Sequence, residues 1–327
     1  MTDRIIPTQT GELLKVNFSH QPLTVSTYNA VTGQYETHEE YSQLLAAASH
    51  VDRADGQIMT HTDTLLSMNV NVDSDGNKVA SFVYRSGVGL SGRELVIRSF
   101  RMENGRAIPI ADAVTLHQSK TAQWRQLIDA GQPTAIREPN GMYVMYDALD
   151  KGKVKASSRR YWVIQTQPEQ FESVIKMPHR VKDVRVLSHG GARHVWSLDK
   201  YGTVAVTVID ADNKLDLAAS RAMTAFFTKA DVKYVAIHTA EDGSGFALDT
   251  HGYLHVFEQK NGVSGYYRSA NPIEAFTQLG EFNTGRLTVN RGQVLLQRYD
   301  EHGAALPVLS ADISDVRQSG TFDLLTG

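Results

Sequence analysis

The sequence predicts an all-β fold: a β-propeller-like array of antiparallel meanders with a few short inserted helices. The main observation is an internal repeat, because segments 183–206 and 231–256 follow nearly the same pattern. Five pairs match at an offset of 50 residues: Trp196 with Phe246, Leu198 with Leu248, Asp199 with Asp249, Gly202 with Gly252 and Val206 with Val256. Upstream, Asp183 matches Asp231 at an offset of 48, so the second copy is expected to carry two more residues in its Gly-rich link. Such a period, made of strands and tight turns, is typical of propellers and similar β-arrays.

Each copy of the repeat predicts three strands. Residues 184–188 show the alternation of a half-buried strand, and residues 194–198 form a second strand. Residues 199–202 form a turn, in which Asp bonds its own backbone and Gly supplies a positive φ. The β-branched segment 203–209 is the third strand. A lone three-stranded meander buries too little apolar surface, so the copies are expected to pack face to face. The alternative is two hairpins that merely share turn chemistry.

The segment before the repeats predicts strands and one helix. A strand is expected at 13–18, and a hairpin at 23–28 and 33–36. Thr37 and Glu40 form a capping box. An apolar stripe follows at helical spacing, made by Tyr41, Leu44, Leu45 and Ala48. We expect a helical insertion near 37–51 in a single propeller-like domain that covers 1–327, because no linker marks a boundary.

One turn resembles a calcium-binding loop. Asn71, Asp73, Asp75 and Gly76 occupy the first, third, fifth and sixth places of an EF-hand. The twelfth place should hold a bidentate Glu, but Phe82 stands there. We therefore predict an ordinary hairpin turn, and no stoichiometric calcium or zinc in protein purified without a chelator.

A second loop, 87–92, spells the dinucleotide pattern G-x-G-x-x-G. That motif requires a following helix, whose N-terminus meets the pyrophosphate. Residues 94–100 alternate in the manner of a strand instead. The glycines are therefore expected to shape a hairpin loop, and no nucleotide or other cofactor is predicted.

Further elements are expected along the rest of the chain. Helices are predicted at 121–130 and from Asn271-Pro272 to Leu279. A weaker copy of the repeat turn follows a strand at 142–146, and the next strand is at 161–165. A hairpin at 287–297, a turn at 300–303 and a last strand at 306–310 complete the expected elements.

The repeat resembles the blade of RCC1-like β-propellers. The resemblance lies in a strand, a Gly-containing link, an aromatic or aliphatic strand ending in Leu-Asp-x-x-Gly, and a Val-rich strand. Residues 184–206 and 232–256 carry it, and 142–156 carry it more weakly, so it covers about a third of the chain. The Gly-Gln-Leu-Gly ending of those blades is absent, and the resemblance implies a fold without an activity.

Composition excludes several classes of protein. The 327 residues have a net charge of -3 and contain no basic run, which argues against an electrostatic nucleic-acid binder. No apolar stretch has the length of a membrane span, and the N-terminus lacks a signal-peptide pattern. A soluble protein of the cytoplasm or of a virion is expected. The absence of cysteine excludes disulfides, thiolate metal sites and cysteine nucleophiles.

The common catalytic motifs are missing. The chain contains no G-x-S-x-G elbow, no H-E-x-x-H helix and no G-K-[ST] phosphate loop. The central repeats are rich in histidine, at His189, His194, His238, His251 and His255. In the sequence alignment these histidines do not fall at equivalent positions, whereas a ring of metal ligands in a propeller would. No metal site is predicted.

Three functions are compatible with these observations. The main hypothesis is a non-enzymatic interaction or structural protein, such as a subunit of a phage virion or tail. The alternatives are a propeller hydrolase or lactonase with a site in the channel, and a glycan-binding propeller. Convergent carboxylates and histidines would favour the hydrolase, and repeating aromatic pockets would favour glycan binding.

A protein partner would contact turns or insertions, because core strands are committed to packing. The candidate partner-binding residues are Lys200 and Tyr201 at one repeat turn, His251 and Tyr253 at the other, and Glu39 and Gln43 on the predicted helix. A solvated tyrosine beside a cation is common in interfaces, since Tyr offers apolar area with a polar end. Ordinary polar turns are the simpler alternative.

Overall fold

The structure is a computed structural model. The described residues are 4–17, 24–49, 64–72, 77–86, 94–104, 106–110, 114–116, 133–137, 143–147, 162–167, 170–176, 181–189, 191–212, 214–228, 232–260, 263–277, 279, 285–290, 292–300, 302, 304–313 and 323–324. Two compact units are present. Unit 1 comprises Met1–Thr8, Leu14–Asp150 and Tyr161–Lys176, and unit 2 comprises Gln9–Leu13, Lys151–Arg160 and Met177–Gly327. The single-domain assignment stays a prediction.

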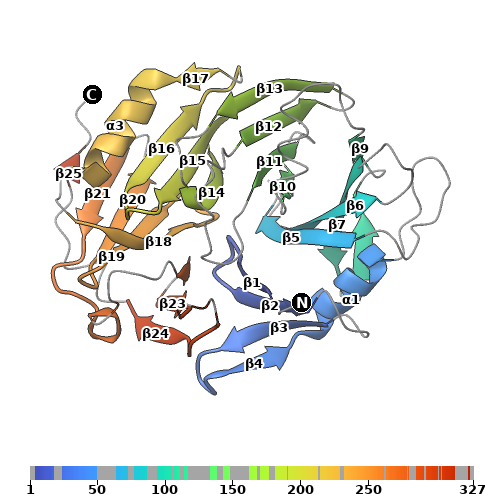
Figure 1. Ribbon diagram of the computed structural model, residues 1–327, viewed down its shortest axis with the longest axis horizontal. Coiled ribbons are helices and arrows are strands. Elements are labelled where there is room, and N and C mark those ends of the chain that lie inside the picture. Colours follow the sequence, from blue (N-terminus) through green and yellow to red (C-terminus); the bar gives the residue numbers. More distant parts are fainter. Residues whose placement is uncertain are drawn as a thin grey trace. The chain divides into compact units, whose positions relative to one another are not determined.

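The fold is all-β, a propeller-like array of antiparallel meanders, which confirms the predicted class. Unit 1 holds three of the sheets found among the described residues, and consecutive strands pair within each sheet except that β9 pairs with β7 (Figure 1). They are β1 (Arg4–Pro7), β2 (Leu13–Asn17), β3 (Thr24–Asn29) and β4 (Gln34–Thr37); β5 (Thr64–Val72), β6 (Lys78–Ser86), β7 (Glu94–Glu103), β8 (Arg106–Pro109) and β9 (Val114–Leu116); and β10 (Pro133–Arg137), β11 (Tyr143–Asp147), β12 (Trp162–Gln167) and β13 (Gln170–Lys176).

Unit 2 holds the other three sheets of the described part of the chain. They are β14 (Val181–His189), β15 (Ala192–Asp199), β16 (Val204–Ile209) and β17 (Leu215–Asp216); β18 (Tyr234–Thr239), β19 (Gly245–Asp249), β20 (Leu254–Lys260), β21 (Val263–Arg268) and β25 (Asp323–Leu324); and β22 (Arg286–Val289), β23 (Gln293–Gln297) and β24 (Leu309–Asp312). The central repeat of the sequence therefore forms two sheets that are neighbours along the chain.

Helix α1 (Glu39–Ser49) confirms the predicted insertion. The side chains of its apolar stripe are all buried in the core of unit 1, where they pack with residues of β2, β3, β5, β6 and β7. The stripe is Tyr41, Leu44, Leu45 and Ala48. The spacing of apolar residues was therefore sufficient to place this helix and its buried face.

Helix α3 (Leu217–Thr228) was not predicted. Asp216 caps it, since the Ala219 N–H donates to Asp216 Oδ1 at 2.9 Å. The helix lies beside β16, where Ser220 and Thr224 accept the N–H groups of Val208 and Val206 at 2.8 and 3.0 Å. Side chains of the helix therefore accept hydrogen bonds from backbone N–H groups of β16 that would otherwise pair with a neighbouring strand.

The helix predicted after Asn271-Pro272 is largely wrong. Only a short 3₁₀ turn, η1 (Glu274–Phe276), forms there, with Phe276 buried in the core. The helix predicted at 121–130 and the weak repeat turn at 148–152 lie outside the described residues.

Both loops that resemble ligand motifs join antiparallel strands. β5 and β6 pair from Val72↔Lys78 outward, and Phe82 is fully buried in the core. β6 and β7 pair from Ser86↔Glu94 outward, so the segment after the glycines is a strand, as predicted. Residues 73–76 and 87–93 of these loops lie outside the described part of the chain.

The repeat is real, but its first strand is offset differently from the sequence alignment. Trp196 pairs with Arg185 in the first copy, and Phe246 pairs with His238 in the second. His238 therefore corresponds to Arg185 at an offset of 53, and Asp183 corresponds to Ala236 rather than to Asp231. The register shifts at the same place in both first strands, between Val181 and Asp183 in the first copy and between Tyr234 and Ala236 in the second. The predicted match of Asp183 with Asp231 is therefore wrong. The second copy does not carry two more residues in its link, because its paired residues His238 and Phe246 are separated by three fewer residues than Arg185 and Trp196.

Trp196 and Phe246 face apolar cores, as the repeat predicts. Their exposed fractions are 0% and 1%. Trp196 packs with Phe227 and Phe257, whereas Phe246 belongs to a second cluster with residues of β22, β23 and η1. The two matched aromatic residues thus belong to two different apolar clusters of unit 2.

Candidate polar relay at Asp249, His255 and Tyr266

The site starts from a turn that occurs three times in unit 2. In each copy one Asp oxygen, Oδ1, accepts the backbone N–H groups two and four residues later. The three sets are Asp199 with Tyr201 and Thr203 at 2.8 and 2.8 Å, Asp249 with His251 and Tyr253 at 2.9 and 2.9 Å, and Asp300 with His302 and Ala304 at 2.9 and 2.7 Å. This is why Asp recurs at the turn, since its short side chain can satisfy local N–H groups. The third copy extends the repeat beyond the two that the sequence alignment revealed.

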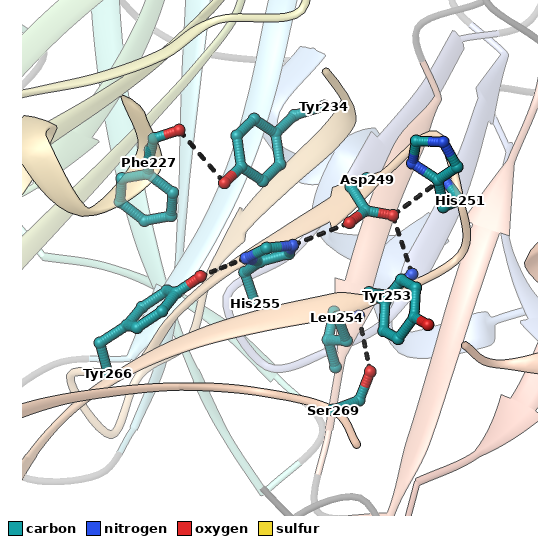
Figure 2. A network of polar contacts seen from close by, with 9 residues as sticks. All are labelled: Phe227, Tyr234, Asp249, His251, Tyr253, Leu254, His255, Tyr266 and Ser269. Atoms are coloured by element: carbon teal, nitrogen blue, oxygen red, sulfur yellow. Dashed lines mark hydrogen bonds and ion pairs between the residues drawn. The ribbon is translucent and has the colours of Figure 1, made fainter. Parts of the chain in front are cut away.

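Asp249 does more than stabilise its turn. Its second oxygen, Oδ2, lies 2.9 Å from Nε2 of His255 on β20, and both side chains have an exposed fraction of 0% (Figure 2). The residue that matches His255 in the first copy is Ala205, so this pair is specific to the second copy. A carboxylate only accepts hydrogen bonds, and therefore His255 Nε2 carries the proton.

The other ring nitrogen of His255, Nδ1, contacts the hydroxyl of Tyr266 on β21 (Figure 2). When the ring is neutral and its proton is on Nε2, Nδ1 accepts the Tyr266 O–H. A chain of carboxylate, imidazole and phenol results. Asp249 and His255 are fully buried, whereas Tyr266 is half-buried.

Aromatic side chains surround the relay. The Tyr234 ring meets His255 edge to face at 5.0 Å, and Phe226 and Phe227 lie against Tyr266 at 5.4 and 6.2 Å between ring centroids. The Tyr234 hydroxyl donates to the Phe227 carbonyl at 3.3 Å. Helix α3 and strands β18, β20 and β21 thus build a mostly apolar wall around the His255 ring.

Burial raises the pKa of the Tyr234 phenol well above its usual range. The negative charges of Tyr266, when ionised, and of Asp249 raise this pKa further, and the nearby cation of Arg268 opposes them. Tyr234 therefore remains protonated and adds no negative charge beside Tyr266.

The predicted partner-binding residues lie at two turns and on α1. Lys200 places its ammonium 4.6 Å from the centre of the Tyr201 ring, and Tyr201 has an exposed fraction of 56%. At the second turn His251 is exposed, and the Tyr253 ring lies 4.5 Å below the Arg268 guanidinium. These positions agree with surface turns, and their role in partner binding stays a prediction.

Glu39 and Gln43 are exposed on α1. Gln43 Nε2 donates to Glu39 Oε1 at 3.3 Å. They belong to unit 1, whereas the two turns belong to unit 2. The candidate set therefore consists of separate surfaces, and its role in binding stays a prediction.

Sequence reasoning missed the role of Tyr266. His255 was singled out only as one of several histidines, and Tyr266 belongs to no motif. The available signal was the polar His255 in a strand whose matching residue is Ala205. Across the described ranges, no group of three or more His, Asp or Glu side chains could hold a metal ion. Within those same ranges, no helix has the length and apolar character needed to cross a membrane.

No family model and no curated protein matches this chain. Several solved structures resemble it at low identity. The Hadza microbial sialidase Hz136 is 11% identical over 96% of this chain and 66% of its own, with a TM-score of 0.45. A Trypanosoma rangeli sialidase in complex with the inhibitor DANA is 10% identical over 97% of this chain and 55% of its own, with a TM-score of 0.40. CoXyl43, a GH43 β-xylosidase/α-arabinofuranosidase from a compost microbial metagenome, is 9% identical over 98% of this chain and 93% of its own, with a TM-score of 0.39.

The expectation of a non-enzymatic structural subunit, such as a virion or tail protein, is contradicted by these structures. All three are named as enzymes, and they agree better with the hydrolase and glycan-binding alternatives. The chain spans less than two thirds of the length of either sialidase. The resemblance to RCC1-like repeats stays a prediction. At these identities and TM-scores the comparisons assign no residue of this chain to an activity, so its chemistry has to be argued from its own side chains.

Proposed function

We propose that the protein is a hydrolase in which Tyr266 is the nucleophile, His255 is the general base and Asp249 orients the imidazole. The observation that carries the proposal is the unbroken chain from Asp249 Oδ2 through both ring nitrogens of His255 to the Tyr266 hydroxyl. A nucleophile beside a base, with the base held by a third group, is the arrangement that activates side-chain hydroxyls in enzymes.

The proposed reaction has two steps. Tyr266 transfers its proton to His255 Nδ1 while its oxygen attacks the electrophilic carbon of the substrate, and the leaving group departs with the proton from His255. Water then attacks the same carbon while His255 accepts a proton from that water. As the bond to Tyr266 breaks, His255 returns this proton to the Tyr266 oxygen, which restores both side chains. The carboxylate of Asp249 stabilises the transient imidazolium in both steps.

The residues around the relay support this role. Asp249 and His255 are shielded from water, which strengthens their interaction. Tyr266 is only half-buried, so it is the most exposed member of the relay. Tyr234 stays protonated nearby, so the Tyr266 phenolate forms without a like charge from that ring.

Glycan binding through repeated aromatic pockets receives less support. In the repeat, Tyr201 corresponds to His251, and Tyr253 corresponds to Thr203. The exposed Tyr201 and the half-buried Tyr253 therefore do not occupy matching places on successive sheets. A sugar remains a suitable substrate for the hydrolase, because the proposed nucleophile can attack either an acyl or an anomeric carbon.

We further propose that a protein partner contacts the Lys200 and Tyr201 tip. This tip carries a large exposed aromatic side chain beside the Lys200 ammonium. Such an amphipathic side chain is a favourable contact in interfaces. This surface is separate from the relay and does not depend on the hydrolase proposal.

Hydrolysis of two panels, nitrophenyl esters and nitrophenyl glycosides, tests the hydrolase proposal. The wild-type chain is expected to release nitrophenol from at least one substrate. Tyr266→Phe should abolish this release, and His255→Gln should lower kcat by a factor of about 100 or more. Tyr201→Phe is the matched control, because it removes the hydroxyl of an exposed tyrosine outside the relay. Turnover that persists in Tyr266→Phe would exclude Tyr266 as the nucleophile.

A further inference from the structure

A second polar cluster lies on the first strands of the three sheets in unit 2. Gln297 stands three residues before Asp300, just as Trp196 and Phe246 stand before their turn aspartates. Gln297 pairs with Arg286 on β22. Arg286 therefore occupies the position of Arg185 on β14 and His238 on β18. Three matching places of the repeat carry basic side chains, a relation that the sequence alignment concealed.

Two of these side chains meet at Asp183. The guanidinium groups of Arg185 and Arg286 lie 2.9 and 3.1 Å from Asp183 Oδ1, and the N–H of Val184 donates to the same oxygen at 3.0 Å. The exposed fractions of the Asp183, Arg185 and Arg286 side chains are 1%, 11% and 13%. A carboxylate and two guanidinium groups are therefore concentrated in a largely buried space.

The other oxygen of Asp183 has no such partners. Among the described residues, Asp183 Oδ2 is buried and accepts no hydrogen bond. Thr288 Oγ1, two residues after Arg286 on the same face of β22, is buried and likewise unpartnered there. A buried polar atom without a hydrogen bond is costly, so each of these two atoms requires a partner from outside the described side chains.

His238 completes the cluster as a neutral ring. Burial, and after it the cation of Arg185, lower the pKa of its imidazole to about 3 against the opposing effect of hydrogen bonds to the carbonyls of Val289 and Leu287. The positive charge of the cluster at neutral pH therefore comes from the two arginines.

We propose that this cluster binds a small oxyanion that carries its own hydrogen-bond donor, such as hydrogen phosphate or a hydroxy acid. The anionic oxygens face the guanidinium groups of Arg185 and Arg286, whose planar donor sets suit carboxylates and phosphates. The O–H of the ligand donates to Asp183 Oδ2, and Thr288 Oγ1 donates to one of its oxygens. The site is independent of the relay at Tyr266.

The comparison of phosphate with sulfate tests this site. Both are tetrahedral oxyanions, but only hydrogen phosphate has an O–H for Asp183 Oδ2 at neutral pH. In calorimetric titrations of the full chain at constant ionic strength, phosphate should bind saturably and at least about tenfold more tightly than sulfate. Chloride is the ionic-strength control and should give no saturable heat.

Variants locate the binding. Arg286→Gln should weaken phosphate binding at least about tenfold. Arg221→Gln, on the exposed face of α3, should leave it unchanged and is the matched arginine control. Asp183→Asn should reduce the preference for phosphate over sulfate, because its amide donates to either anion. Circular dichroism verifies that each variant is folded.

Three results would overturn the proposal. Equal affinity of the wild-type chain for phosphate and sulfate would remove the role of Asp183 Oδ2. Absence of saturable phosphate binding would remove the site. Unchanged phosphate affinity in folded Arg286→Gln would place the anion elsewhere. The first two results come from the unaltered chain, so they decide the question even if a variant does not fold.

Discussion

The indole ring of Trp196 lies directly against the backbone of Gly245, since a β-carbon at Gly245 would come within 2.1 Å of Trp196 Cζ2. Trp196 is on β15 and Gly245 begins β19, so this contact joins two successive sheets of unit 2. The close approach leaves no room for a side chain. Gly245 is therefore required by packing rather than by its backbone angles.

Gly245→Ala should lower the free energy of unfolding by about 1–3 kcal/mol, because the added methyl group overpacks the Trp196 ring. Urea denaturation measures the change. Gly292→Ala is the control, since a β-carbon there meets no atom within 4 Å. If both variants lose the same amount of stability, the contact with Trp196 is not responsible.

Removal of the matched aromatic side chains tests the repeat itself. Trp196→Ala and Phe246→Ala should each lower the free energy of unfolding by roughly 3–5 kcal/mol, because each leaves a cavity in a core with almost no exposed surface. A loss below about 1 kcal/mol, measured by urea denaturation, would show that the side chain is not buried.

Local patterns predicted the elements that depend on local chemistry. The apolar stripe placed α1, and the Asp-x-x-Gly turns placed the ends of β15 and β19. In these cases the structural information lies within a few consecutive residues, as in the two N–H groups that Asp199 binds. The predicted capping box at Thr37 is wrong, because Thr37 ends β4 and His38 Nδ1 accepts the Tyr41 N–H at 3.3 Å at the start of the helix.

Features that depend on strand pairing could not be predicted in the same way. The alignment matched Asp183 with Asp231, whereas the hairpin register places Asp183 opposite Leu198 and Ala236 opposite Leu248. The same limit concealed the relay. His255 and Tyr266 come together because β20 pairs with β21, and no motif links the two residues in the sequence.

Acid should destabilise the protein through His238. The pKa of His238 is about 3 in the folded chain and 6.5 as its ordinary value, so the unfolded chain binds more protons between these limits. The stability contributed by the neutral His238 ring is therefore fully present above pH 6.5 and is lost as the pH falls toward 3.

The expected contribution of His238 to the loss of stability from pH 7 to pH 4.5 is about 2–3 kcal/mol. His238→Gln removes this titration and should lose correspondingly less stability over the same interval. Urea unfolding at the two pH values measures both proteins. Equal losses in wild type and variant would contradict a neutral buried His238.

The candidate surfaces for a protein partner call for paired substitutions. We expect Lys200→Ala with Tyr201→Ala, or Glu39→Ala with Gln43→Ala, to reduce the recovery of a partner that co-purifies with the wild-type chain. Surface substitutions of this kind change stability by only about 0.5 kcal/mol, so urea unfolding is the control for the fold. If partner recovery persists in both double variants, neither surface forms the interface.

The relay of Asp249, His255 and Tyr266 is tested most directly by the rate at which Tyr266 reacts with an aryl sulfonyl fluoride, followed by mass spectrometry. Tyr266 is expected to be labelled faster than the more exposed Tyr201 in the same sample, because His255 accepts the phenol proton. His255→Gln should slow the labelling of Tyr266 by a factor of about 100 or more and leave that of Tyr201 unchanged. Slower labelling of Tyr266 than of Tyr201 in the wild-type chain, or the same Tyr266 rate in folded His255→Gln, would contradict an activated Tyr266.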